Sequence, residues 1–93
     1  MAWRIEFTEA ADKAIRKLDR EAAGKVLDKL EGISQLEDPR SQGKALVGNL
    51  AGLWRYRVGD HRIVCDIENE VLVVLVVDVA HRSEVYGRRR WKR

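Results

Sequence analysis

The 93-residue sequence is poor in cysteine and proline, with one of each. A single cysteine, Cys65, excludes a disulfide framework and a cysteine-based zinc site within one chain, and it is typical of a protein in a reducing compartment. With 45% hydrophobic and 35% charged residues, the composition indicates a folded protein rather than a disordered one. The length allows one core, so we expect a single domain over residues 1–93 and no separate cofactor domain.

The sequence also lacks a long apolar run. Its longest such stretch, residues 71–77, is far shorter than a membrane-spanning segment. Residues 1–8, MAWRIEFT, do not have the pattern of a secretory signal. We therefore expect a soluble cytoplasmic protein with no membrane partner.

The net charge of +3 is unevenly distributed along the chain. Residues 1–51 contain equal numbers of basic and acidic side chains, so the excess lies entirely in residues 52–93. Residues 82–93 alone contain six basic groups against Glu84, and the tail from about residue 87 reads GRRRWKR. Such a cluster indicates a polyanionic partner, with nucleic acid as the leading candidate.

The first half of the chain predicts one strand and two helices. Residues 3–7 alternate apolar and polar side chains, which is the pattern of a half-buried strand. Thr8 and Asp19 are suitable N-caps, and each is followed by apolar residues at helical spacing. The two helices should follow one another almost without a loop and end before the turn-rich residues 38–43.

The second half predicts three strands, at residues 53–58, 61–67 and 71–79, joined by Gly59-Asp60 and by residues 68–70. The last strand is apolar at consecutive positions, as expected of a central strand covered on both faces, and should also pair with the first. The predicted fold class is α+β, in the order β-α-α-β-β-β. Two N-terminal helices would pack on a mainly antiparallel four-stranded sheet.

A two-residue loop at Gly59-Asp60 would set Arg57 opposite Arg62 and Arg55 opposite Val64. Three arginines would then share one face of the sheet. The opposite face, which suits the helices, would hold Trp54, Tyr56, Val58, Ile63, Cys65 and Ile67. Opposed like charges cost roughly 0.2–1 kcal/mol, and a guanidinium binds phosphate oxygens in pairs. The pattern indicates an RNA-backbone site; the alternative is a solvated basic face.

His81 and Tyr86 are the remaining candidates for chemistry. If the second hairpin also has a two-residue turn, His81 lies near the arginine face, whereas a three-residue turn would reverse this. Histidine titrates near neutrality, and tyrosine offers a hydroxyl and a ring on which a base can stack. The alternatives are a locally hydrogen-bonded histidine and a packing tyrosine. His61 is predicted on the core face, in a structural role.

Motifs for metal or cofactor chemistry are absent from the sequence. Asp66 and Asp78 do not have the spacing of metal ligands. No Gly-rich phosphate loop, Ser/His/Asp set or paired carboxylate motif is present. We expect neither a metal nor a cofactor.

Three segments together resemble the RelE branch of the RelE/ParE toxin superfamily. They are Lys44-x-Leu46-x-Gly48, residues 52–64 (GLWRYRVGDHRIV) and residues 81–86 (HRSEVY). The resemblance implies a toxin of a type II toxin–antitoxin system that enters the ribosomal A site and cleaves mRNA. It further implies attack of a 2′-hydroxyl on the adjacent phosphate, a 2′,3′-cyclic phosphate product and no metal.

By position, the resemblance implies that Arg62 and Arg82 hold the scissile phosphate and its developing charge. It implies that Tyr86 stacks on or orients the nucleotide and can share in proton transfer. Arg55 and Arg57 occupy the basic strand that family members use for phosphate contact and catalysis.

Two positions depart from the family pattern and leave the general base open. Leu53 stands where some members have a lysine, and His61 stands where the family usually has tyrosine. We propose His81 as an accessory acid or base, because it is the titrating group predicted nearby.

The resemblance also implies a cognate antitoxin, a small acidic protein that wraps the toxin. Operator DNA would be contacted only through that complex, and the other partners would be the ribosome and mRNA. One alternative is a ParE-like inhibitor of DNA gyrase without RNA cleavage, and another is a binding module that has lost catalysis. The set Arg62, Arg82 and Tyr86 favours the nuclease.

Overall fold

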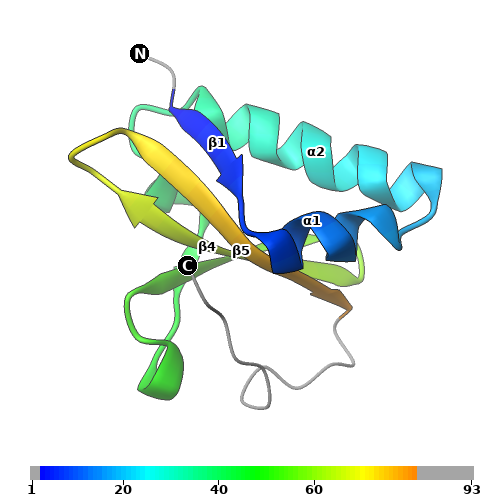
Figure 1. Ribbon diagram of the computed structural model, residues 1–93. Helices are drawn as coiled ribbons and strands as arrows, with labels where there is room; N and C mark the ends of the chain where they lie inside the picture. The colour runs from blue at the N-terminus through cyan, green and yellow to red at the C-terminus, as the bar shows by residue number, and fades with distance from the viewer. Residues whose placement is uncertain (1–2, 82–93) are drawn as a thin grey trace.

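The computed structural model describes residues 3–81 as one helix-covered sheet (Figure 1). Two helices follow the first strand, and the remaining strands come after them, which confirms the predicted α+β class and element order. The elements are β1 (Arg4–Phe7), α1 (Glu9–Arg16), α2 (Arg20–Ser34), β2 (Lys44–Ala45), β3 (Leu53–Val58), β4 (His61–Glu68) and β5 (Val73–His81), with 3₁₀ turns at Pro39–Gln42 and Gly48–Leu50.

The sheet has five strands in the order β1-β5-β4-β3-β2. β1 pairs with β5, as predicted, and the structure shows that this pairing is parallel, whereas every other pairing is antiparallel. The fifth strand is β2, which the sequence did not predict. It pairs only Lys44 with Arg55 and Ala45 with Trp54, and two residues are too few to show a strand pattern.

Both helices begin at the predicted caps. The Thr8 hydroxyl accepts a hydrogen bond from the Ala11 amide at 3.1 Å and donates one to the Val77 carbonyl at 3.0 Å. The Asp19 carboxylate accepts from the Ala22 amide at 2.7 Å. Each cap satisfies an amide at the first helical turn that has no partner within the helix.

The helices cover one face of the sheet and form the core with it (Figure 1). Within residues 3–81, neither helix is long and apolar enough to cross a membrane. The predicted core face of the second half is confirmed, because Tyr56, Ile63 and Cys65 are buried within the cluster. The core cluster comprises Ala11, Val26, Leu30, Ile33, Tyr56, Ile63, Cys65, Val74, Val76 and Val79.

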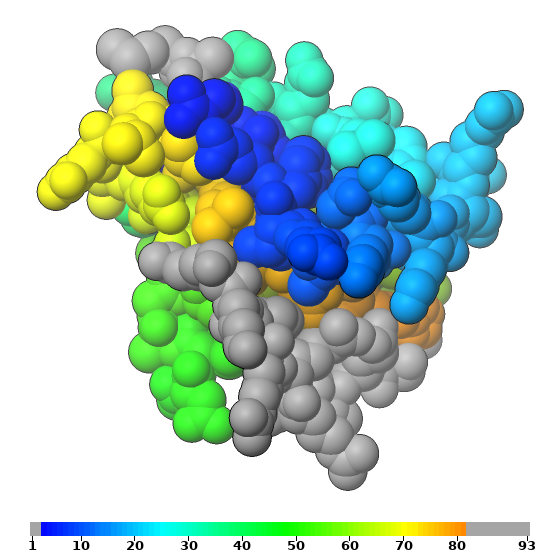
Figure 2. Space-filling view, viewed as in Figure 1, coloured from blue at the N-terminus to red at the C-terminus, as the bar shows by residue number. Residues whose placement is uncertain are grey.

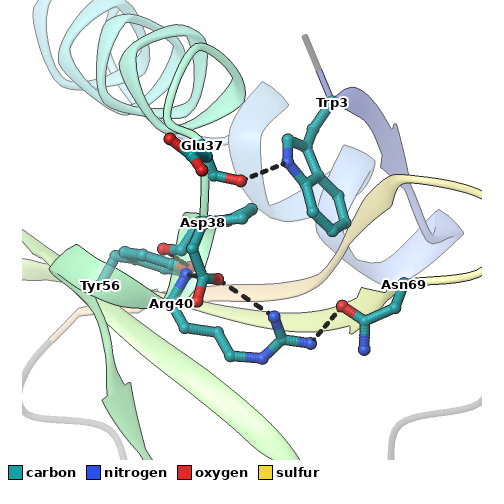
Figure 3. Close-up of polar contacts among 7 residues, drawn as sticks. Trp3, Glu37, Asp38, Arg40, Tyr56 and Asn69 are labelled. Atoms are coloured by element: carbon teal, nitrogen blue, oxygen red, sulfur yellow. Dashed lines mark hydrogen bonds and ion pairs between the residues drawn. The ribbon is translucent and has the colours of Figure 1, made fainter. Parts of the chain in front are cut away.

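A polar network connects the segment before β2 to β3 and to the β4–β5 turn (Figure 3). The Arg40 guanidinium donates to Asp38 at 3.1 Å and to Asn69 at 2.7 Å, and lies 5.9 Å from the centroid of the Trp54 ring. The Tyr56 hydroxyl donates to the Pro39 carbonyl at 2.7 Å. These contacts attach the 3₁₀ turn of Pro39–Gln42 to the sheet and so determine where β2 begins.

The β4–β5 hairpin differs from the prediction in two respects. The connection comprises four residues, 69–72, and β5 begins at Val73 rather than at residue 71. The strand register also shifts between Val64 and Cys65, since Val64 pairs with Asp78 while Cys65 pairs with Val76. Val77 is therefore the extra residue of a β-bulge, and it reverses the side-chain alternation of β5 beyond it.

Candidate nucleic-acid interface

The β3–β4 hairpin has the predicted register. Gly59 has a positive φ of 57°, and Asp60 is not among the described residues with positive φ. Glycine with positive φ at the first position of a two-residue loop is the pattern of a type II′ turn, whose twist matches that of the strands. Arg57 consequently pairs with Arg62, and Arg55 with Val64.

Four basic residues share the sheet face that the helices leave uncovered, and we call this set the basic face. Arg55 and Arg57 come from β3, and Arg62 comes from β4. Lys44 joins them from β2, because residues paired across strands point to the same side and Lys44 pairs with Arg55. The sequence prediction included the three arginines and missed Lys44, whose only local signal is its place in the Lys44-x-Leu46-x-Gly48 segment.

The approach of the chain to Lys44 depends on a close contact. A Cβ atom on Gly43 would lie 2.9 Å from Cε2 of the buried Tyr56 ring. Only glycine therefore lets the backbone cross the ring and enter β2. This contact and the hydrogen bond from the Tyr56 hydroxyl to Pro39 together place Lys44 beside Arg55.

The basic face is accessible to a ligand. Lys44 and Arg57 are exposed, while Arg55 and Arg62 are half-buried. Within residues 3–81, no carboxylate forms an ion pair with Lys44, Arg55 or Arg57. Guanidinium groups in this setting are suited to binding phosphate, since they are partly desolvated and held by adjacent strands.

Two aspartates lie on the same side of the sheet, next to the basic face. Asp66 pairs with Leu53, and Asp78 pairs with Val64. Both are buried, with 9% and 1% of their surface exposed, and one oxygen of Asp78 accepts the Val79 amide at 2.9 Å. In the part of the chain that the structure describes, no group of three or more His, Cys, Asp or Glu side chains could hold a metal ion.

The predicted position of His81 near the arginines is wrong. The connection between β4 and β5 has an even number of residues, as the prediction assumed, but the bulge at Val77 reverses the alternation before the strand reaches His81. His81 therefore pairs with His61 on the helix side, with ring centroids 5.4 Å apart. His61 itself lies on the predicted face.

The other sequence candidates, Arg82 and Tyr86, lie outside the described residues, as does the basic tail from residue 87. Cys65 is fully buried, and this burial raises the pKa of its thiol, so it is a core residue rather than a nucleophile.

The structure is a small α+β domain with a basic sheet face opposite a two-helix layer, and comparison with known proteins identifies the class to which such a domain belongs. The ParE toxin of type II toxin–antitoxin systems (parDE) is a family whose profile matches residues 5–86. Toxin RelG of Mycobacterium tuberculosis is 31% identical over 88 residues, which span 95% of this chain and 100% of RelG.

Solved structures show the same relationship. The toxin–antitoxin complex RelBE2 of Mycobacterium tuberculosis matches with a TM-score of 0.81 and 28% identity, covering 90% of this chain and 95% of that one. A doubly arginine-to-alanine substituted E. coli toxin RelE in the free state matches with a TM-score of 0.76 and 30% identity, covering 94% and 93%. The chain belongs to the RelE/ParE superfamily of type II toxin–antitoxin toxins.

Proposed function

We propose that this toxin is a ribosome-dependent endoribonuclease that cleaves mRNA in the A site and thereby inhibits translation. The observation that carries the proposal is the basic face, where Lys44, Arg55, Arg57 and Arg62 converge from three adjacent strands. The similarity to RelG and RelE agrees with the resemblance to the RelE branch, and that resemblance is what implies RNA cleavage.

In the proposed reaction, the 2′-oxygen of one nucleotide forms a bond to the adjacent phosphorus while the bond from phosphorus to the 5′-oxygen breaks. The products are a 2′,3′-cyclic phosphate and a 5′-hydroxyl. Negative charge grows on the phosphoryl oxygens in the transition state, and fixed guanidinium groups stabilise it because they need no reorganisation. This chemistry does not require a metal ion.

The residue roles follow the family positions. Arg62 and Arg82 hold the scissile phosphate, and Tyr86 orients the nucleotide and shares in proton transfer. Arg55 and Arg57 bind the flanking backbone. The proposal assigns no acid or base role to His81, because its side chain lies on the helix side of the sheet.

We further propose that an antitoxin binds and neutralises this toxin in the cytoplasm. The similar structures include the toxin–antitoxin complexes RelBE2 and the intact E. coli RelBE. An acidic antitoxin would complement the basic face, and operator DNA would be contacted only through the complex.

A translation extract with a defined mRNA, supplied with or without ribosomes, tests the activity. Cleavage that occurs only when ribosomes are present is the expected result. Intact mRNA together with inhibited supercoiling by DNA gyrase would instead establish a ParE-like toxin, the toxin after which the matching family is named.

Single substitutions test the site. Arg62→Ala and Tyr86→Phe should each slow cleavage markedly while binding of the antitoxin persists. Arg20→Ala is the matched control, because this exposed arginine begins α2, on the side of the sheet away from the basic face. Normal cleavage by both variants would contradict the assignment of Arg62 and Tyr86 to the cleavage site.

A further inference from the structure

A second cationic surface lies on the helix side, where α1 crosses the end of β5. Figure 2 shows the blue surface of α1 bordering the orange end of β5. Here a hollow of about 380 Å³ opens between the helix and the sheet. Its lining residues are Ala10, Lys13, Ala14, Lys17, Leu18, His61, Val79 and His81, and we call it the lysine–histidine hollow.

The charge of this hollow contrasts with that of its neighbour. Among residues 3–81, no carboxylate lines the lysine–histidine hollow. The adjoining hollow shares His61 but is lined by three carboxylates, Asp19, Glu21 and Asp60, against one amine, Lys25. Beside the lysine–histidine hollow, Glu9 forms an exposed ion pair with Lys13 at 3.2 Å. An anion would therefore be attracted to the lysine–histidine hollow and repelled by the carboxylate-lined hollow.

We propose that the lysine–histidine hollow binds a phosphate group of an RNA chain, with the adjacent base against the histidine rings. Lys13 lies on α1, and Lys17, four residues later, is the C-cap of that helix with helical φ and ψ, so the two lysines lie on one side of the helix. Imidazole adds a donor for phosphate oxygens and a flat ring for a base. The apolar floor of Ala14, Leu18 and Val79 suits a ribose or base edge better than it suits an acidic peptide.

The hollow also lies next to the basic face. His61 and Arg62 are consecutive residues of β4, so their side chains point to opposite sides of the sheet at the same strand end. RNA held by Arg62 could thus continue around this end of the sheet to Lys13 and Lys17. This extension rests on the proposed function, but binding to the hollow can be measured without cleavage.

The test is binding of the full-length chain to a fluorescent single-stranded RNA made entirely of 2′-O-methyl nucleotides. This probe lacks the 2′-hydroxyl nucleophile, so a catalytic toxin cannot destroy it. Lys13→Gln/Lys17→Gln should weaken binding about tenfold at low salt. The plot of log association constant against log[salt] should become less steep, by about 0.7 for each lost phosphate contact. The charge-retaining variant Lys13→Arg/Lys17→Arg should bind as the unsubstituted chain does.

The matched control is Lys25→Gln/Lys29→Gln on α2. It makes the same charge change at the same four-residue spacing, but Lys25 borders the carboxylate-lined hollow and Lys29 contacts Gln42 at 3.4 Å. This control should bind within about twofold of the unsubstituted chain, because it changes net charge without changing the hollow.

Three outcomes would overturn the inference. The first is unchanged RNA binding by Lys13→Gln/Lys17→Gln, and the second is an equal loss in the α2 control. The third is a Lys13→Gln/Lys17→Gln variant that loses antitoxin binding but still binds RNA, which would show that the hollow binds an acidic peptide. Absence of ribosome-dependent cleavage by the unsubstituted chain would instead overturn the proposed function, while the 2′-O-methyl probe would still report on the hollow.

Discussion

Replacing Tyr56 with phenylalanine should reveal how strongly the segment before β2 is held to the sheet. Tyr56 is 1% exposed, and its hydroxyl donates to the carbonyl of buried Pro39 at 2.7 Å. Tyr56→Phe keeps the ring, so no cavity forms, but it leaves that carbonyl without this donor. A buried polar group that loses its partner costs about 1–3 kcal/mol. At about 4–8 °C per kcal/mol for a domain of this size, a loss of about 1.5 kcal/mol lowers Tm by roughly 6–12 °C.

The same substitution should change the response to alkaline pH. Burial is the largest cause that raises the pKa of Tyr56 above its ordinary value of 10.0, and Cys65 adds to it. The unfolded chain therefore releases the phenolic proton near pH 10 while the folded chain keeps it. Stability from this group is complete below pH 10 and is lost as the pH rises further, by up to about 1.4 kcal/mol per pH unit.

Urea unfolding followed by tryptophan fluorescence at several pH values between neutral and strongly alkaline measures both effects. The Tyr56→Phe chain should be less stable at neutral pH, and its stability should fall less steeply above pH 10. Cys65, whose pKa burial also raises, contributes its own alkaline loss to both chains, so the difference between the chains reports Tyr56 together with its interaction with Cys65. Equal stability at neutral pH, or parallel decline above pH 10, would refute the reasoning.

Two further predictions concern the glycines and the basic face. Gly24→Ala, in an exposed part of α2 with no heavy atom within 4 Å of the new Cβ, should raise the free energy of unfolding by about 0.5–1 kcal/mol. Gly43→Ala, whose Cβ would meet the Tyr56 ring at 2.9 Å, should lower it by about 1–3 kcal/mol; thermal melts showing the reverse order would contradict the contact. Arg57→Ala removes the like charge opposite Arg62 and should stabilise the fold by up to about 1 kcal/mol while weakening RNA binding. A parallel loss of both stability and binding would mean that the face is structural.

The predictions that proved right depend on short stretches of sequence. Thr8 and Asp19 cap their helices because a cap needs only its own side chain and an amide three residues on. The hairpin turn needs a residue with positive φ, which Gly59 adopts readily, and the two-residue loop then aligns Arg57 with Arg62. The three-arginine part of the site was therefore predictable, whereas Arg82 and Tyr86 stay predictions.

The amino-acid sequence by itself determined the order of the predicted elements, the inward faces of β3 and β4 and the pairing of the two hairpin arginines, because all of these follow from alternation and turn length. Only the tertiary structure decided that Lys44 joins the basic face and that His81 leaves it. Lys44 reaches Arg55 through contacts of Gly43 and Pro39 with Tyr56, a residue distant in sequence. His81 turns toward the helices because one extra residue is accommodated at Val77, and no local pattern marks where a strand absorbs such a residue.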